Sequence, residues 1–211
     1  NLEYLVLSGN SELIGPIPPE LGQLSDLLHL ELASEEAGSL LSGQIPTELG
    51  NLLNLEVFVI QNSLISGPLP MEIYGLIKLK VLDLGNNQLS GTILPEIGNL
   101  VDLENLDLGG NAYMSGPIPP EIGKLIRLQY LYLGDSNLSG TLPPEIGNLS
   151  GLRVLQIDGN PLFGPLPKTL TNINNQHFRF DRTSLCEPPD EDFQAWLDGI
   201  VDLHSSKIVC E

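Results

Sequence analysis

Apolar residues recur along the chain in a fixed frame of strand-like and turn-like segments. In residues 79–102, LKVLDLGNNQLSGTILPEIGNLVD, leucine stands at the first, fourth, sixth and eleventh positions and asparagine at the ninth. The frame occurs seven times, starting at Leu2, Leu27, Leu55, Leu79, Leu103, Leu128 and Leu152. A repeat of 24 to 28 residues that cannot bury its apolar face alone predicts a solenoid of stacked coils.

The first part of each repeat alternates apolar and polar residues, which predicts a short strand with its apolar side chains pointing inward. The inward pairs are Leu5/Leu7, Leu30/Leu32, Phe58/Ile60, Leu82/Leu84, Leu106/Leu108, Leu131/Leu133 and Leu155/Ile157. A side-chain amide in the turn that follows can satisfy backbone groups that no strand reaches. We therefore predict a structural asparagine ladder formed by Asn10, Asn87, Asn111 and Asn160. Glu35 and Ser136 stand in its place in the second and sixth repeats, where we expect looser packing.

The second part of each repeat predicts a bend and a short turn on the convex side. Proline in the Gly-x-Ile-Pro step fixes φ and lacks an N–H. The segment Pro-x-Glu-Ile-Gly then predicts a 3₁₀ or irregular turn that ends at Gly22, Gly50, Gly98, Gly123 and Gly147. Leu94 replaces the proline of the fourth repeat, but Pro95 follows at once, so we expect the bend to remain. Residues 33–43 insert about three residues before the bend, and Glu35 and Glu36 are expected to project from this loop.

The leucine spacing stops at Asn172. Phe178 and Phe180 keep the inward alternation and predict a terminal strand. Asp190 then has the position of a helix N-cap, followed by apolar residues at helical spacing, namely Phe193, Trp196, Leu197 and Ile200. The sequence thus predicts a solenoid over residues 1–175 and a C-terminal cap with a strand and a helix over residues 176–211.

Four repeats share a more specific sequence motif, which occurs as LSGQIP (41–46), ISGPLP (65–70), MSGPIP (114–119) and LSGTLP (138–143). This motif resembles that of the plant-type leucine-rich repeat family, which includes receptor-kinase ectodomains and polygalacturonase inhibitors. Residues 178–200 are instead similar to the C-terminal cap of secreted bacterial leucine-rich repeat proteins. The resemblance implies an α/β solenoid, a right-handed curved superhelix with a parallel concave sheet, short convex turns and a helical C-terminal cap.

Cys186 and Cys210 are the two cysteines of the chain, and they flank the predicted cap helix. They could be free thiols. The resemblance to secreted proteins favours a disulfide, and with it an oxidising compartment and a secreted or cell-surface location.

The chain is acidic, with 9 Lys and Arg against 27 Asp and Glu and a formal net charge of −18. This charge argues against nucleic acid as a partner, although it can also simply maintain solubility. The sequence contains no stretch of 18 apolar residues, so it predicts no membrane span in this chain. Residue 1 directly precedes a repeat, so we expect Leu2, Leu5 and Leu7 to lie at an open edge, covered by an upstream segment or by a second molecule.

Residues that point out of the strands would form columns along the concave face. The ligand-binding residues that we predict there are Tyr4, His29, Glu31, Val59, Asp83, Asn105, Asp107, Tyr130, Tyr132, Gln156 and Arg179. Tyr130 and Tyr132 are the expected anchors, since rigid aromatic side chains lose little entropy on binding.

Asp83 and Asp107 occupy equivalent places in adjacent strands, about 5 Å apart, a separation at which retaining glycosidases also place two carboxylates. We expect an open, solvated sheet there, without a pocket to raise either pKa. The histidines His29, His177 and His204 are expected on distant elements. We therefore predict no catalytic residue, metal or cofactor. Asn137 and Asn148 begin two glycosylation sequons.

The function that the resemblance implies is an extracellular, non-enzymatic module that binds a protein or peptide on its concave face. A structural or adhesive component of the cell envelope is the first alternative. An ice- or glycan-binding surface is another, although it would need a regular exposed column of Thr or Asn, and the predicted columns are irregular. An enzyme has no support in the sequence.

Overall fold

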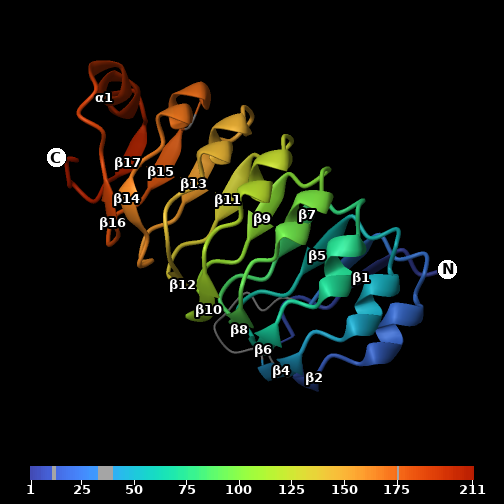
Figure 1. Cartoon of the computed structure of the whole chain (residues 1–211). Helices are drawn as coiled ribbons and strands as arrows, with labels where there is room; N and C mark the ends of the chain where they lie inside the picture. The colour runs from blue at the N-terminus through green and yellow to red at the C-terminus, as the bar shows by residue number, and fades with distance from the viewer. Residues whose placement is uncertain (11–12, 33–39, 175) are drawn as a thin grey trace.

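The computed structural model describes residues 1–10, 13–32, 40–174 and 176–211. Its coils stack side by side from the N-terminus at the right of Figure 1 to the C-terminus at the left. The insertion predicted at 33–43 lies largely outside the described residues, and so do Glu35 and Glu36.

Within this part of the chain, a nine-stranded parallel sheet takes one short strand from each coil and confirms the predicted sheet. Its strands are β1 (Tyr4–Val6), β3 (His29–Glu31), β5 (Val57–Val59), β7 (Val81–Asp83), β9 (Asn105–Asp107), β11 (Tyr130–Tyr132), β13 (Val154–Gln156), β15 (His177–Arg179) and β17 (Asp202–His204). The terminal strand expected at Phe178 is β15, whereas β17 was not predicted.

The Leu-Ser-Gly segments, which lead into the predicted Gly-x-Ile-Pro bends, form a second parallel sheet along the lower edge of the stack in Figure 1. It contains β2 (Ile14–Pro16), β4 (Leu40–Gln44), β6 (Leu64–Pro68), β8 (Gln88–Gly91), β10 (Tyr113–Gly116) and β12 (Asn137–Leu138). A smaller sheet pairs β14 (Phe163–Pro165) with β16 (Ser184–Cys186). On the side of the second sheet, these coils therefore contain a short strand that the sequence analysis did not predict.

The third side of the stack consists of 3₁₀ turns, as predicted. They are η1 (Pro19–Gln23), η2 (Thr47–Asn51), η3 (Met71–Gly75), η4 (Pro95–Asn99), η5 (Pro120–Lys124), η6 (Pro144–Asn148) and η7 (Lys168–Asn172). The glycine of a turn allows close stacking, because a Cβ at Gly22, Gly50, Gly98, Gly123 or Gly147 would come within 2.1 to 3.0 Å of the next coil.

Tyr74 of η3 stands where η1, η2, η4, η5 and η6 have this glycine. Its side chain is buried, and its hydroxyl accepts a hydrogen bond from the backbone N–H of Leu94 at 3.4 Å. Proline, which the frame would place at position 94, has no N–H to donate. The two departures from the frame therefore compensate each other, and η3 and η4 approach less closely than the other neighbouring turns.

The inward positions of the nine-stranded sheet form the core, and most of the predicted pairs are fully buried. The first pair is different, since Leu5 is partly buried and Leu7 is 36% exposed. Leu7 and Leu2 lie at the open edge that we expected beside β1.

The asparagine ladder is present inside the stack. The amide of Asn111, which is buried, donates to the carbonyl oxygens of Leu84 and Leu108, and its Oδ1 accepts from the N–H of Leu89. Asn87 and Asn160 make equivalent bonds. Asn10 is exposed and donates to the carbonyl oxygen of Leu7 in its own coil, as Asn111 does to Leu108, and its role in satisfying buried groups stays a prediction. Looser packing at Ser136 stays a prediction.

The C-terminal helix α1 (Glu191–Asp198) begins as predicted at Asp190, whose Oδ1 accepts from the N–H of Phe193. Phe193 and Leu197 are buried, and the indole of Trp196 donates to the carbonyl oxygen of Ile173. A disulfide joins Cys186 to Cys210, as the sequence favoured. The division of the chain at residue 175 stays a prediction.

Candidate functional site

The outward side chains of the nine-stranded sheet are called the concave face below. The strand register aligns one column of them, which contains Val6, Glu31, Val59, Asp83, Asp107, Tyr132, Gln156, Arg179 and His204. A second column brings Tyr4, His29, Asn105 and Tyr130 into line along the same face. Tyr4 is exposed and the other predicted binding residues are half-buried, so the register gathers all of them on one continuous surface.

Near the N-terminal end, Glu31 is held by two neighbours. The Ser8 hydroxyl donates to one carboxylate oxygen, and His29 Nε2 lies 3.0 Å from the other. These contacts lower the pKa of Glu31, with the bond from Ser8 as the largest cause. Tyr4 lies beside His29, with 6.0 Å between the ring centroids.

In the middle of the face, Asp83 and Asp107 are register partners on β7 and β9. Each accepts a hydrogen bond from the N–H two residues later, at Gly85 and Gly109. Burial, with a smaller contribution from the neighbouring Asp83, raises the pKa of Asp107 to about 7. Burial also raises the pKa of Asp83.

The expectation of a solvated sheet without a pocket is therefore wrong at this place. Side chains from several adjacent coils desolvate Asp107, a crowding that one repeat does not reveal. A polar pocket of about 290 Å³ opens at the carboxyl ends of the strands beside it. Its lining residues are Asn86, Asp107, Gly109, Gly110, Tyr132, Gly134, Asp135, Gln156, Asp158, Arg179 and Arg182.

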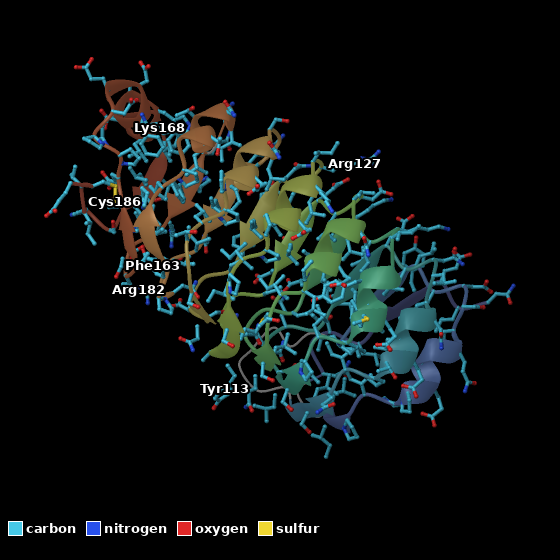
Figure 2. The ribbon with its side chains drawn as sticks, viewed as in Figure 1. Tyr113, Arg127, Phe163, Lys168, Arg182 and Cys186 are labelled. Atoms are coloured by element: carbon cyan, nitrogen blue, oxygen red, sulfur yellow. A yellow bond between two sulfur atoms is a disulfide. The ribbon has the colours of Figure 1, made fainter. Side chains whose placement is uncertain are left out.

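Arg182 is a pocket residue that the sequence analysis missed. Its guanidinium lies 2.8 Å from Asp135 Oδ1 and 2.6 Å from Asp158 Oδ2, and thereby joins the last three coils. Its backbone has a φ of 55°, like Asn86 and Asp135 at the same place in their coils. This shared place in the repeat was the signal that could have found it. Figure 2 labels Arg182 near the C-terminal end, on the same edge of the stack as Tyr113.

The C-terminal end of the face holds a cluster around Asp202 of β17. His177 Nδ1, Arg179 and His204 Nε2 lie 3.1 to 3.2 Å from its carboxylate. The hydrogen bond from His177 is the largest cause that lowers the pKa of Asp202. The expectation that the histidines lie on distant elements is wrong for His177 and His204, because the unpredicted strand β17 pairs with β15.

A second pocket, of about 470 Å³, lies between the last coils and the cap. It is mainly apolar and includes Leu142, Pro165, Pro167 and Pro189. Nothing in the described structure indicates what would cover it.

Elsewhere in the described residues, no group of three His, Cys, Asp or Glu side chains has the arrangement of a metal site. No helix in this part of the chain is long and apolar enough to span a membrane. The chemistry that the face offers is therefore hydrogen bonding, ion pairing and aromatic contact.

Comparison with known proteins gives the same architecture. The profile of the Leucine Rich Repeat family matches residues 1–24, 78–100 and 127–149. The chain is a leucine-rich repeat protein. Its repeats have the plant-type frame found in receptor ectodomains. No curated protein matches the sequence at a significant level.

Two solved receptor structures are similar over nearly the whole chain. The ectodomain of the Arabidopsis thaliana membrane receptor kinase GASSHO1/SCHENGEN3, in complex with CASPARIAN STRIP INTEGRITY FACTOR 2, has 34% identity over 95% of this chain and a TM-score of 0.87. The plant peptide hormone receptor RGFR1, in complex with RGF2, has 31% identity over 97% and a TM-score of 0.81. The leucine-rich repeat chain spans 23% and 32% of the lengths of these two proteins.

A plant ice-binding protein is similar in fold alone. It has 22% identity over 98% of this chain and 83% of its own, with a TM-score of 0.64. The likeness of the cap to secreted bacterial proteins stays a prediction.

Proposed function

We propose that this leucine-rich repeat chain is an extracellular recognition module that binds a peptide or protein on its concave face. The observation that carries the proposal is the alignment of Tyr130, Tyr132 and Gln156 with charged side chains on one half-buried surface. Half-buried aromatic and polar groups of this kind are typical of interface centres. The similar receptors, which are named as complexes with a peptide hormone or an integrity factor, give further support.

An extracellular location agrees with the disulfide between Cys186 and Cys210. Asn137 and Asn148, the two sequon asparagines, are exposed on β12 and at the end of η6. Neither lies on the nine-stranded sheet, so a glycan at either position would leave the concave face accessible.

Binding is favoured over catalysis, because Asp83 and Asp107 have no neighbouring nucleophile in the described structure and no enclosed substrate site. A cell-envelope or adhesive role, and an ice- or glycan-binding surface, are the alternatives. An ice- or glycan-binding surface would be expected to use a regular exposed column, whereas this face mixes acidic, aromatic and basic residues.

The test selects short random peptides that bind the immobilised protein and measures their affinity for variants. The double variant Tyr130→Ala/Tyr132→Ala should bind about 30-fold more weakly, a hot-spot effect of about 2 kcal/mol. Tyr113→Ala is the matched control, because Tyr113 is exposed on β10, outside the concave face (Figure 2). Equal loss in both variants, or no loss in either, would remove the concave face as the binding surface.

A further inference from the structure

We propose that the polar pocket beside Asp107 takes a cationic group of the ligand, an ammonium or a guanidinium, which pairs with Asp107. This inference rests on the proposed function, since it assigns the chemistry of one part of the ligand that the concave face would bind. Three observations carry it: the shape of the pocket, the charge balance of its walls, and the burial of Asp107.

The pocket exists because three successive coils carry glycine at one position of the frame. Gly85, Gly109 and Gly134 stand where other coils have Gln61 and Asp158. A Cβ at Gly85 would lie 2.9 Å from Asp107 Oδ1, so the carboxyl group occupies the space that a side chain there would fill. A Cβ at Gly134 would lie 2.8 Å from Asp158 Oδ1. The glycines therefore create the hollow and leave room for a carboxyl group in its wall.

Asp107 is the carboxyl group of the pocket lining that has no ion pair. Arg182 pairs with Asp135 and Asp158, and Arg179 pairs with Asp202 outside the pocket. No ion pair of the described residues includes Asp83 or Asp107. The two carboxyl groups accept backbone N–H bonds and lack a counter-charge. An incoming cation would supply it, whereas an incoming anion at Arg182 would compete with the carboxylates of Asp135 and Asp158.

Because burial desolvates Asp107, the absence of a counter-charge beside it increases what a bound cation would contribute. A carboxyl group on an open surface is stabilised by water and gains little from a partner, but a desolvated one gains more from a cation at hydrogen-bond distance. The pKa of Asp107, raised to about 7 by burial and by Asp83, means that the free protein holds a proton there near neutral pH. A bound cation favours the ionised form, so binding should release a proton.

The pH dependence follows from the groups that face Asp107. Those groups are Asp83 from β7, Tyr132 from β11, and Asp135, Asp158, Arg179 and Arg182 around the pocket. The pKa of Tyr132 is also raised, mainly by burial, so it stays neutral through this range. Asp107 is thus the group that should govern the change near pH 7. As the pH rises toward the pKa of Asp107, the affinity for a cation should increase by up to about tenfold per pH unit. Above that pKa the affinity should level off.

The experiment uses small probes with the intact chain and follows binding by NMR titration at about pH 5.5 and about pH 7.5. Acetyl-arginine amide and acetyl-lysine amide carry a side-chain cation, glycylglycine amide carries an N-terminal ammonium, and acetyl-glutamine amide is the neutral control. At least one cationic probe should bind about tenfold or more tightly at the higher pH, with the Asp107 carboxyl signal shifting on binding. The probe that binds best distinguishes a basic side chain from a chain terminus.

Variants decide whether Asp107 is responsible. Asp107→Asn should abolish the pH dependence and weaken binding about tenfold or more at the higher pH. Asp102→Asn is the matched control, because it removes one charge beside Arg127, which lies on the opposite edge of the stack from Tyr113 in Figure 2. This control should bind like the original chain.

Equal affinity at both pH values, equal loss in the two variants, or equal binding of the neutral probe would overturn the inference. These outcomes leave the proposed function standing if selected peptides still require Tyr130 and Tyr132. Conversely, loss of that requirement with Asp107-dependent binding of a cationic probe would overturn the proposed function while leaving the cationic pocket.

Discussion

The first and the last coil of this chain differ in how well their inward side chains are covered. In the first coil, Leu5 is partly buried and Leu7 is 36% exposed, and β1 has a strand on one side in the described structure. In the last coil, Phe178 and Phe180 are fully buried. Helix α1 and strand β17 lie over this end at the left of Figure 1.

The difference shows what a coil needs when a neighbour is absent. Leucines fit between two coils, but a terminal coil must cover a wider apolar cross-section. Larger aromatic side chains do this at the C-terminal end, with Phe178 and Trp196 6.1 Å apart and Phe193 and Trp196 5.3 Å apart between ring centroids. The same alternating pattern therefore yields a buried strand at one end and an exposed one at the other.

The largest expected effect is at the cap. Phe193→Ala should lower the free energy of unfolding by about 3–5 kcal/mol, because the ring is buried against Trp196 and its loss leaves a cavity. Leu7→Ala, in the first coil, should cost about 1 kcal/mol, because this inward side chain is already partly exposed. Urea unfolding of both variants measures the contrast. Similar losses in the two would contradict the assignment of a closed and an open end.

The disulfide sharpens the same comparison. The double variant Cys186→Ser/Cys210→Ser should lose about 3 kcal/mol, as expected when a loop of 24 residues is no longer closed. Hydrogen exchange should then speed up first in β16, β17 and α1 and last in β7 and β9. Faster exchange that begins at β1 would show that the cap is not the element held by this bond.

A third contrast uses one residue type at one position of the frame. Asn111→Ala should cost about 2–3 kcal/mol, because it leaves the carbonyl groups of Leu84 and Leu108 and the N–H of Leu89 without partners. Asn10→Ala should cost about 0.5 kcal/mol, since Asn10 is exposed. Thermal unfolding tests both, and an equal loss would mean that the ladder does not depend on its neighbours.

The smallest expected effect is on the pH dependence of the free energy of unfolding. The folded-state pKa of Asp107, about 7, lies above that of an unfolded carboxyl group, so its contribution to stability is full below about pH 4 and is lost as the pH rises through 7. Asp107→Asn should therefore stabilise the protein above pH 7, by about 2 kcal/mol, and have little effect at low pH. Denaturant unfolding across this range gives the difference curve.

Glu31, nearer the open end of the same column, should behave in the opposite way. Its pKa is lowered, so its contribution is present above the unfolded-state value and is lost as the pH falls through the lower folded-state value. Glu31→Gln should therefore destabilise at neutral pH and not at low pH. The same sign for both variants would contradict the environments described for them.

The repeat frame predicted the structural features that the sequence of a single coil determines. It gave the inward leucines, the 3₁₀ turns and the columns that bring Asp83, Asp107 and Tyr132 into line, because these depend on local periodicity and on register. It did not give properties set by neighbouring coils. The second sheet needs the Leu-Ser-Gly segments to pair across coils, and the burial of Asp107 needs side chains from coils on both sides. Arg182 reaches Asp135 across 47 residues of sequence, and no periodicity describes its side chain.

Tyr74 marks the place where two neighbouring 3₁₀ turns are less closely packed than the others. Evenly spaced coils would curve uniformly, since each would turn by the same small angle relative to the last. The sheet holds its strands about 4.8 Å apart, so the wider gap between η3 and η4 on the opposite side means a larger turn between the third and fourth coils.

The molecule can thus be regarded as two arcs joined between β5 and β7. An extended ligand that crossed this joint would have to bend as it passed from Val59 to Asp83, whereas one confined to β9 through β15 would meet a single arc. The length of a ligand would then decide how much conformational entropy it loses on binding.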